Sequence, residues 1–306
     1  MKKLLLILVL AVMCSSVARA DDFEDAYKEW NSGNSDLFIP LAEQGDARAQ
    51  HYLGLSLMDG IGGVTEDKKE GVRWHRKAAE QGHVGSQVEL GYAYIYGWGV
   101  IKDHKKSVKW FRKAAEQGDT TGQNNLGYAY RSGRGVIKDH KKSVSWFQKS
   151  AEQGDFYGQL GLGKAYKRGG GVIQDYKRSL KWFRKAAENE TVDVVVRKTA
   201  YLELAHMYSD EKSVIYNASE AVKSARLAVP YGSSKIILGT SYHHGEGVMQ
   251  DYARAHMYYN LQGGELGGLL RDDIAKIMTP GQIAEAQRMA RECEKAYKVK
   301  YIWTCE

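Results

Sequence analysis

The chain contains only three cysteines, and after its first residues it lacks any long apolar run. A helix needs about 20 consecutive apolar residues to cross a bilayer. The rest of the chain is therefore predicted to contain no membrane-spanning helix.

The first twenty residues have the pattern of a secretory signal peptide. Lys2 and Lys3 supply the positive charge, residues 4–12 are apolar, and Ala18 and Ala20 are the small residues that a signal peptidase needs. We expect cleavage after Ala20 and a mature protein that is periplasmic or secreted.

The chain also lacks a strong excess of charge of one sign. Removing the three basic residues of the signal peptide from 44 leaves 41 against 37 acidic residues, a formal net charge of +4. Basic and acidic residues are interleaved, whereas a nucleic-acid-binding protein gathers its basic residues on one face. We therefore expect no nucleic-acid partner, and only weak attraction to acidic partners or to an anionic envelope surface.

Two cysteines remain after the expected cleavage, Cys293 and Cys305. An even number of cysteines in an oxidising compartment favours a disulfide between them. This bond would tie the tail to the last helix, and two free thiols are the alternative. Acylation of Cys14 in a lipoprotein is disfavoured, because Met13 stands where a small residue is required.

The chain does contain a repeat with a period of 36 residues. The tryptophans that mark this period are Trp74, Trp110, Trp146 and Trp182, and the aspartates are Asp67, Asp103, Asp139 and Asp175. Leu-Gly pairs, Gly-Val pairs and an Ala-Ala-Glu-Gln-Gly segment also recur at fixed phases. Self-similarity at such a period is typical of repeat architectures.

Each repeat is predicted to form two helices. Residues 123–131 carry apolar side chains on one helical face, and Gly133 ends this first helix because glycine accepts the left-handed geometry of a tight turn. Asp139 is the expected N-cap of the second helix, which ends at Gly154. Gly127 lies inside the first helix, where it costs stability unless it lets a neighbouring helix approach closely.

The segment LGYAYRSGRGVIKDHKKSVSWFQKSAEQGD resembles a Sel-one-like repeat, a relative of the tetratricopeptide repeat. The resemblance implies an all-α protein, an α/α solenoid of about six helix-pair repeats with a C-terminal capping helix. The capping helix begins with a capping box, Thr279-Pro280-Gly281-Gln282. The expected organisation is a signal peptide at 1–20, an N-terminal half-repeat at 21–45, four repeats at 46–188, a degenerate repeat at 189–232, a further repeat at 233–268 and a C-terminal helical cap at 269–306.

No catalytic constellation is predicted. Residues 209–212 fit Ser-x-x-Lys, the pattern of penicillin-recognising serine enzymes, but the companion motifs of those enzymes are missing. The densest set of possible metal ligands is His243, His244, Glu246 and His256. The two adjacent histidines would diverge by about 100° on a helix, so we expect no metal, and no Walker lysine follows the glycine-rich turns. We therefore expect no cofactor.

Helix-pair solenoids usually bind partners on the surface lined by their first helices. Positions i, i+3 and i+7 of each first helix are not required for packing. The candidate partner-binding residues at such positions are Glu89, Tyr92, Tyr96, Asn125, Tyr128, Lys164 and Arg168. Ile237, Thr240 and His244 have the same phase in the last repeat. Tyrosine is favoured at interfaces, and packing against the next repeat is the alternative role for these tyrosines.

The sequence therefore predicts a monomeric, exported module for protein–protein interaction, acting as an adaptor, a regulator or an inhibitor, without enzymatic activity. Two alternatives remain open. One is a β-lactamase-like or cell-wall-directed hydrolase, and the other is a structural scaffold of the envelope.

Overall fold

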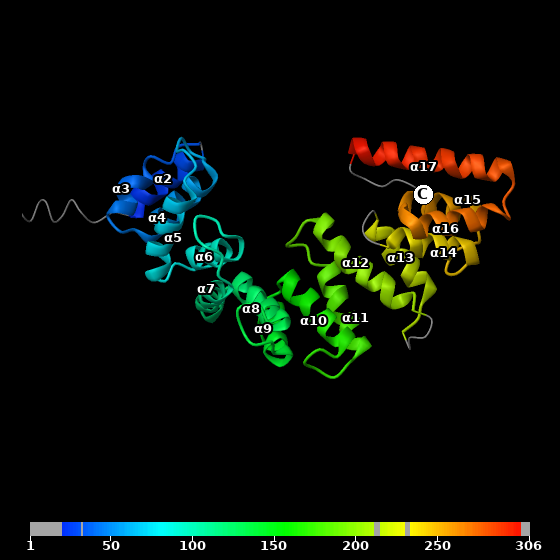
Figure 1. Cartoon of the computed structure of the whole chain (residues 1–306), viewed down its shortest axis with the longest axis horizontal. Coiled ribbons are helices and arrows are strands. Elements are labelled where there is room, and N and C mark those ends of the chain that lie inside the picture. The colour runs from blue at the N-terminus through cyan, green and yellow to red at the C-terminus, as the bar shows by residue number, and fades with distance from the viewer. Residues whose placement is uncertain (1–19, 32, 211–214, 230–232, 301–306) are drawn as a thin grey trace, which may run out of the picture. The chain divides into compact units, whose positions relative to one another are not determined.

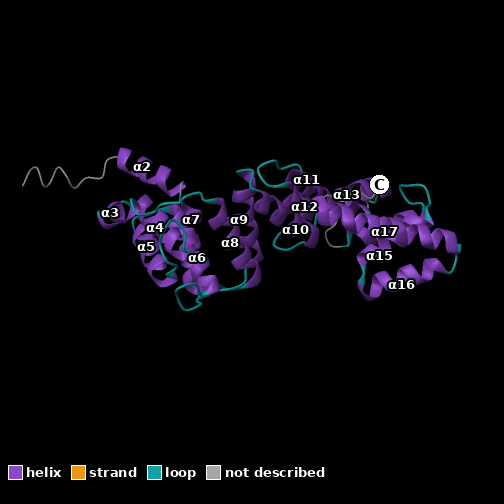
Figure 2. Cartoon of the chain, turned by 90° about the horizontal axis from the view of Figure 1, so that it is seen from above, coloured by secondary structure: helices purple, strands orange, loops and turns teal. Residues whose placement is uncertain are grey.

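The computed structural model describes residues 20–31, 33–210, 215–229 and 233–300, and these residues form helices and connecting turns without strands (Figures 1 and 2). The helices of the first half are α2 (Ala20–Asn31), α3 (Phe38–Glu43), α4 (Ala47–Asp59), α5 (Lys68–Glu80), α6 (Val84–Tyr96), α7 (His104–Glu116), α8 (Thr120–Ser132) and α9 (His140–Glu152). The helices of the second half are α10 (Phe156–Arg168), α11 (Tyr176–Ala187), α12 (Val194–Tyr208), α13 (Ala218–Ala228), α14 (Ser234–His244), α15 (Tyr252–Gln262), α16 (Gly264–Ala275) and α17 (Pro280–Lys300). The predicted all-α repeat fold is confirmed. Most of the expected signal peptide, residues 1–19, lies outside the described residues.

The chain divides into two compact units, Met1–Gln153 and Gly154–Glu306. Within each unit, helices that follow one another in the chain pack against one another. Over the described residues, no helix combines the length and the apolar character that crossing a bilayer requires.

The helix boundaries follow the predicted caps. Asp139 accepts a hydrogen bond from the backbone N–H of Lys142 at 3.0 Å and so caps α9. Gly133 ends α8 with a φ of 76°, a left-handed conformation that glycine adopts without strain. The capping box of α17 is also present, because Thr279 donates its backbone N–H to Gln282 Oε1 at 2.8 Å.

The glycine inside each first helix makes room for an aromatic ring of the second helix. A Cβ atom on Gly91 would lie 2.5 Å from Phe111 Cε1, and one on Gly127 would lie 2.6 Å from Phe147 Cε1. Both rings are only 1% exposed and belong to the core. In the second unit, Phe183 and Tyr259 pack in the same way on Gly163 and Gly239. The predicted packing role of these glycines is confirmed.

Consecutive repeats are linked by the glutamine of the Ala-Ala-Glu-Gln-Gly segment. Gln81 donates its side-chain amide to the backbone oxygen of Gly45 at 3.0 Å and to Gln50 Oε1 at 2.8 Å. The same pair of bonds recurs from Gln117 to Gly82 and Gln87, and from Gln153 to Gly118 and Gln123. In the second unit Asn189 replaces the glutamine and bonds Gly154 and Gln159. We call this series the amide ladder.

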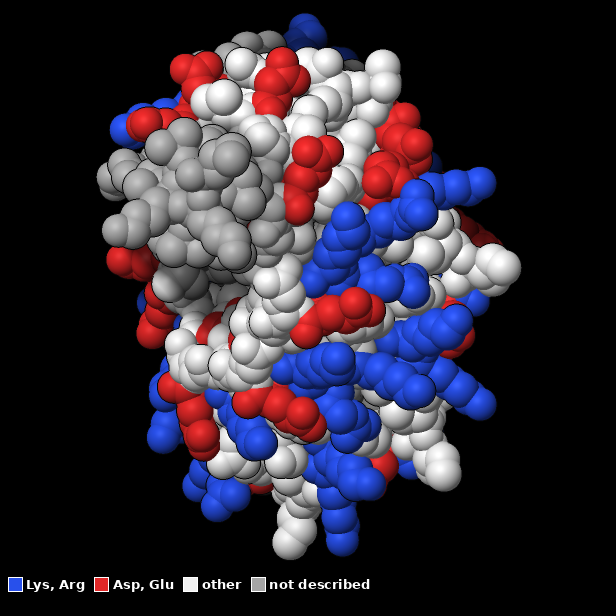
Figure 3. All heavy atoms as spheres, turned by 90° about the vertical axis from the view of Figure 1, so that its left-hand side faces the viewer, with Lys and Arg blue, Asp and Glu red and all other residues white. Residues whose placement is uncertain are grey.

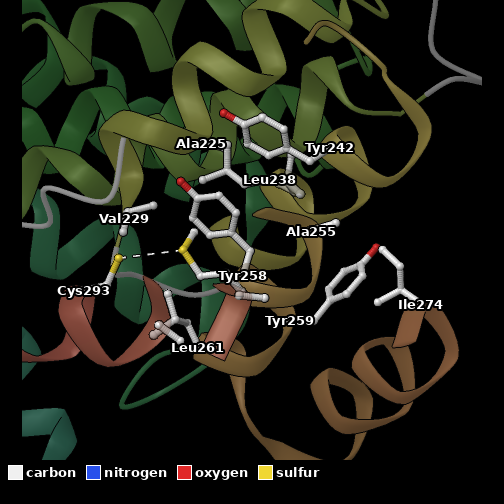
Figure 4. Packing of buried hydrophobic residues seen from close by; sticks show 14 of the residues in the cluster. Ala225, Val229, Leu238, Tyr242, Ala255, Tyr258, Tyr259, Leu261, Ile274 and Cys293 are labelled. Carbon is white, nitrogen blue, oxygen red and sulfur yellow. Dashed lines mark hydrogen bonds between the residues drawn. The ribbon is translucent and has the colours of Figure 1, made fainter. Parts of the chain in front are cut away.

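The C-terminal cap consists of two helices, α16 and α17, rather than the single helix that was expected. α16 also spans the predicted boundary after residue 268, and its glycine content hides it from a propensity-based prediction. Tyr258 and Leu261 of α15 pack near Cys293 of α17 (Figure 4), and Cys293 Sγ lies 3.9 Å from Met257 Sδ. Cys305 lies outside the described residues, so its disulfide with Cys293 stays a prediction.

Candidate functional site

The candidate partner-binding residues of the first unit lie on α6 and α8. Tyr92 and Tyr128 are half-buried and Tyr96 is exposed, whereas the adjacent Leu90 and Leu126 are fully buried. These tyrosines are therefore more exposed than the leucines beside them, and their role in binding stays a prediction.

Three aromatic side chains of the second repeat stack on this face. The rings of Tyr92 and Tyr96 are stacked with centroids 6.3 Å apart, and those of Tyr96 and Trp98 are stacked at 4.6 Å. Tyr96 is 54% exposed and Trp98 39% exposed. We call these residues the aromatic cluster. Trp98 was not predicted, although this is the only repeat with an aromatic residue between its turn glycines.

Asn125 connects the aromatic cluster to the third repeat. Its side-chain amide donates hydrogen bonds to Tyr92 Oη at 3.2 Å and to the backbone oxygen of Thr121 at 2.9 Å. Burial raises the pKa of the Tyr92 phenol, although the hydrogen bond from Asn125 opposes this shift. The predicted residues of two consecutive repeats are thus brought together.

A cavity of about 280 Å³ lies beside the aromatic cluster, between the second and third repeats. Tyr96, Asn125 and Tyr128, three of the candidate residues, line it. Val108 and Phe111 give it an apolar wall. The remaining lining residues are Ile95, His104, Ser107, Ala129, Ser132 and Arg134. None of these described lining residues is acidic, so the cavity suits an apolar side chain with a carboxylate beside it.

The tyrosines at equal phase also pack within their own repeats. Tyr92 meets Phe111 edge to face at 5.3 Å between centroids, and Tyr128 meets Phe147 at 5.0 Å. Removing either tyrosine would therefore affect stability as well as the surface. Tyr96 has no such buried partner among the described ring contacts, and it offers the largest free aromatic area.

The acidic candidate, Glu89, is half-buried. Burial raises the pKa of its carboxyl group, and the charge of Asp59 adds to the shift. A further negative charge close to Glu89 would therefore be unfavourable.

The two candidates in the second unit differ in their availability. Lys164 and Lys167 both contact the Glu203 carboxylate, at 3.5 and 2.9 Å. Burial raises the pKa of Glu203, but the hydrogen bond and charge of Lys167, with those of Lys164, outweigh it and lower the pKa. Lys164 thus serves the structure of its own unit, whereas Arg168 is exposed at the end of α10.

A second cavity, of about 440 Å³, occupies the equivalent place in the second unit, between the degenerate repeat and the last one. The two places correspond because Asp103 and Asn217 donate their backbone N–H groups to Tyr94 and Tyr208 in the same way. The second cavity is lined by Ile237, Thr240 and His244 at the predicted phase, with Glu246 where the first has Arg134. The two cavities therefore have opposite charge at their rims.

Ser209, His243 and His244, which were weighed for catalysis or metal binding, lie in the second unit. Ser209 ends α12 and lines the second cavity, while Lys212 lies outside the described residues. The rings of His243 and His244 stack on each other at 4.5 Å. In the described part of the chain, no group of three or more histidine, cysteine, aspartate or glutamate residues could hold a metal ion.

Three histidines that were not predicted to interact meet in the first repeat. The ring of His51 lies 5.3 Å from that of His75 and 4.6 Å from that of His83. The Ser86 hydroxyl bridges His51 Nδ1 at 3.0 Å and His75 Nδ1 at 3.4 Å. His75 is 1% exposed, and its Nε2 has no hydrogen-bond partner. We call these three residues the histidine cluster.

The histidine cluster is uncharged near neutral pH. Burial, with the charges of the other two histidines, lowers the pKa of His75 to about 3, and burial with the charge of His83 lowers that of His51 to about 4. Burial also lowers the pKa of His83, on which Asp46 and Arg48 act in opposite directions. Writing the repeats in register singles out His75 and His83, which stand where the next repeat has Phe111 and Asp119, but not His51, whose position varies between repeats.

Known proteins share the repeat. The profile of the Sel1 repeat, which is the Sel-one-like repeat expected from the sequence, matches residues 47–83, 84–119, 120–155, 157–190 and 234–261, more than half of the chain. A solved Sel1 repeat protein from Oxalobacter formigenes is 28% identical, with a TM-score of 0.65 over 78% of this chain and 97% of that one. A protective antigen present in uropathogenic Escherichia coli strains, displaying an SLR fold, is 23% identical, with a TM-score of 0.55 over 89% of this chain and 83% of that one. No curated protein sequence matches the chain.

Proposed function

The chain belongs to the Sel1 repeat family, and on that premise we propose that it is an exported scaffold that binds another protein on the first-helix face of its first unit. In this role it acts as an adaptor, a regulator or an inhibitor. Repeat scaffolds of this kind present extended binding surfaces rather than catalytic groups.

The observation that carries this proposal is the aromatic cluster next to the first cavity. Tyrosine and tryptophan are enriched among the residues that dominate binding energy, since they bury a large area and keep a polar tip. Here Tyr96 is already held by stacking on Tyr92 and Trp98. Binding would therefore cost little additional side-chain entropy.

The cavity defines the chemistry of the partner segment. An apolar side chain would fill the space between Tyr96, Phe111 and Tyr128. A carboxylate beside it would meet Arg134 and His104 at the rim. The partner is therefore a protein with an exposed segment that combines an apolar and an acidic residue.

The test uses a pair of variants that each remove an exposed tyrosine. The mature wild-type protein captures its partner from an envelope extract, mass spectrometry identifies that partner, and the affinity is then measured with the purified partner. Truncating a central aromatic anchor typically costs about 2 kcal/mol or more of binding energy, so Tyr96→Ala should weaken binding about thirtyfold. Tyr157→Ala, which removes a 46% exposed tyrosine from α10 in the second unit, is the matched control.

Melting curves of both variants accompany the binding measurements. The proposal requires weaker binding by Tyr96→Ala at an unchanged melting temperature, and unchanged binding by Tyr157→Ala. Equal affinity of both variants for the partner would place the binding surface elsewhere.

Export is part of the proposal and has its own test. Intact-mass measurement of the periplasmic protein should show a chain that begins at Asp21. Alkylation of the unreduced, denatured protein should label neither Cys293 nor Cys305 if they are bridged. A retained N-terminus or two labelled thiols would contradict these expectations separately.

A further inference from the structure

Each unit exposes two large aliphatic side chains at the same place in the repeat. Ile101 and Ile137 are 90% and 91% exposed in the first unit, and Ile173 and Met249 are 90% and 88% exposed in the second. All four follow the valine of the Gly-Val turn. That valine packs partly against the core in three of these turns, at Val100, Val136 and Val248. The turn therefore buries one aliphatic residue and presents the next one to solvent.

The turns of neighbouring repeats are stacked in the first unit. A Cβ atom on Gly99 would lie 2.1 Å from the backbone oxygen of Lys68, and one on Gly135 would lie 2.2 Å from that of His104. Each turn thus rests on the beginning of the preceding second helix. Ile101 and Ile137, two residues after these glycines, consequently project from one edge of the unit.

The same edge is basic. Each isoleucine is followed within five residues by three exposed lysines, which are Lys102, Lys105 and Lys106 in one turn and Lys138, Lys141 and Lys142 in the next. The one carboxylate in each segment, on Asp103 or Asp139, is the N-cap of its helix and accepts a backbone N–H. It also pairs with Lys106 at 3.7 Å or with Lys142 at 3.6 Å, so each segment keeps an excess of two positive charges. The N-terminal ends of α7 and α9 add the positive end of their helix dipoles. Figure 3 shows Lys and Arg side chains, with Asp and Glu side chains among them, in the view onto the end where the N-terminal helices lie.

We propose that this edge binds the surface of a bilayer that contains anionic lipid. Ile101 and Ile137 enter the boundary between head groups and acyl chains, while the flanking lysines contact lipid phosphates. Juxtamembrane lysines are attracted to anionic leaflets, and exposed aliphatic side chains add apolar burial to that attraction.

A bilayer fits these side chains better than a protein partner does. A protein would need a pocket for each protruding isoleucine, whereas a bilayer accepts separate aliphatic side chains without shape complementarity. Neither isoleucine lines either of the two cavities described above. The turns adjoin the proposed protein-binding face, because Arg134 and His104 of the first cavity lie in or beside them. Ile101 and Ile137 do not line that cavity, so substituting them tests this inference separately.

The experiment is co-sedimentation of the mature full chain with vesicles. One preparation is an equimolar mixture of phosphatidylcholine and phosphatidylglycerol, and the other is phosphatidylcholine alone. The wild type should bind the mixed vesicles and not the zwitterionic ones, and added salt should weaken this binding. The double variant Ile101→Ser, Ile137→Ser should weaken it about tenfold or more, since each buried aliphatic side chain contributes to partitioning.

Two variants of the first repeat serve as controls. Thr65 occupies the place of Ile101 in that repeat, so Thr65→Ile should strengthen binding to the mixed vesicles. Ile61→Ser removes a 43% exposed isoleucine from the same turn but outside the series, and it should leave binding unchanged. Melting temperatures should not change, because the substituted side chains are exposed.

The proposal is overturned if the wild type does not sediment with the mixed vesicles, or if both Ile→Ser substitutions leave sedimentation unchanged. It is also overturned if the isoleucines prove necessary for capture of a soluble protein while vesicles bind neither the wild type nor the variants.

Discussion

The first repeat and the two that follow it have the same backbone but different cores. Phe111 and Phe147 fill the space above the glycine of the first helix, and His75 takes that place in the first repeat above Gly54. Its Nδ1 reaches the Ser86 hydroxyl, where the next repeat has Gly122. The helix pair therefore has an aromatic ring at this place in each of these repeats. It accommodates the polar ring of His75 where the Ser86 hydroxyl offers a hydrogen-bond partner to one ring nitrogen.

The polar version makes the first repeat sensitive to pH. The folded-state pKa values of His51 and His75, about 4 and about 3, lie below the ordinary 6.5. As the pH falls below about 6.5, these histidines take up protons in the unfolded chain and not in the folded one. The stability they contribute is therefore complete above that pH and is lost progressively as the pH falls toward their folded-state values. Phe111 and Phe147, which take the place of His75 in the next two repeats, do not titrate.

The largest expected effect comes from placing the polar ring where it has no partner. Phe111→His would bury two ring nitrogens opposite Gly122, without the hydroxyl that Ser86 provides in the first repeat. We expect a loss of about 4 kcal/mol in the free energy of unfolding, since each unsatisfied buried polar group costs about 1–3 kcal/mol and apolar contacts are also lost. Urea denaturation at neutral pH measures it. A cost below about 1 kcal/mol would show that any ring suffices there.

Acidification is the second way to separate the two kinds of repeat. Each of the two histidines loses about 1.4 kcal/mol per pH unit while it titrates only in the unfolded chain. Between about pH 7 and about pH 5, the first repeat should lose roughly 3 kcal/mol. Hydrogen exchange should accelerate in α4 and α5 more than in α7 and α8. Equal acceleration in both pairs would argue against the histidine cluster as the cause.

The converse substitution, which replaces the histidine of the first repeat by phenylalanine, should reduce the loss of stability on acidification by about half. His75→Phe gives the first repeat the residue that its neighbours have, above a glycine that already accommodates a ring. It should recover about 1.5 kcal/mol at about pH 5, and less near neutrality, because only one of the two titrations is removed. His140→Phe, at an exposed position, is the control and should leave the pH dependence of urea denaturation unchanged. The idea fails if the two variants behave alike.

The smallest expected effect concerns the outside of the same helices, where the repeats do not differ. Lys77 Nζ lies 3.6 Å from the centroid of the Trp74 ring, and Lys113 Nζ lies 4.4 Å from that of Trp110. Lys77→Ala and Lys113→Ala should each cost about 0.5 kcal/mol, as for an exposed cation–π contact. If thermal melts show similar losses of stability for the two variants, the repeats differ only in their cores. A clearly larger loss for one variant would show that the repeats also differ at their surfaces.

Most of the fold could be predicted because each structural feature of the repeat recurs several times in the sequence. The glycines that end the first helices, the aspartates that begin the second ones and the Gly91–Phe111 approach all recur with the period of 36 residues. α16 does not belong to the repeat and begins with Gly264, Glu265 and Leu266, so neither period nor propensity indicates it. The 36-residue period therefore predicts the elements that the repeats share, but not a helix such as α16 that occurs only once.

The candidate site was predictable to the level of a helical face. The phase of Tyr96, Asn125 and Tyr128 follows from the heptad geometry of α6 and α8, and these residues do line a cavity. Their contacts do not follow from phase, because the pairing of Lys164 with Glu203 depends on α12, which has no clear repeat pattern. The histidine cluster was missed for a related reason. Its members come from three different phases and meet only in space.

The amide ladder restricts how the length of such a chain can change in evolution. Each rung takes its acceptors from the preceding repeat, so an inserted segment keeps the ladder intact if it is a complete copy of the repeat, which measures 37 residues from Gly45 to Gly82 and 36 from Gly82 to Gly118. An insertion of only part of a repeat would leave one side-chain amide and one backbone oxygen without their hydrogen-bond partners at the point of insertion. Duplication and deletion of whole copies are therefore the changes that selection can accept. The four identical Ala-Glu-Gln-Gly segments that end at Gly45, Gly82, Gly118 and Gly154 are consistent with such a history.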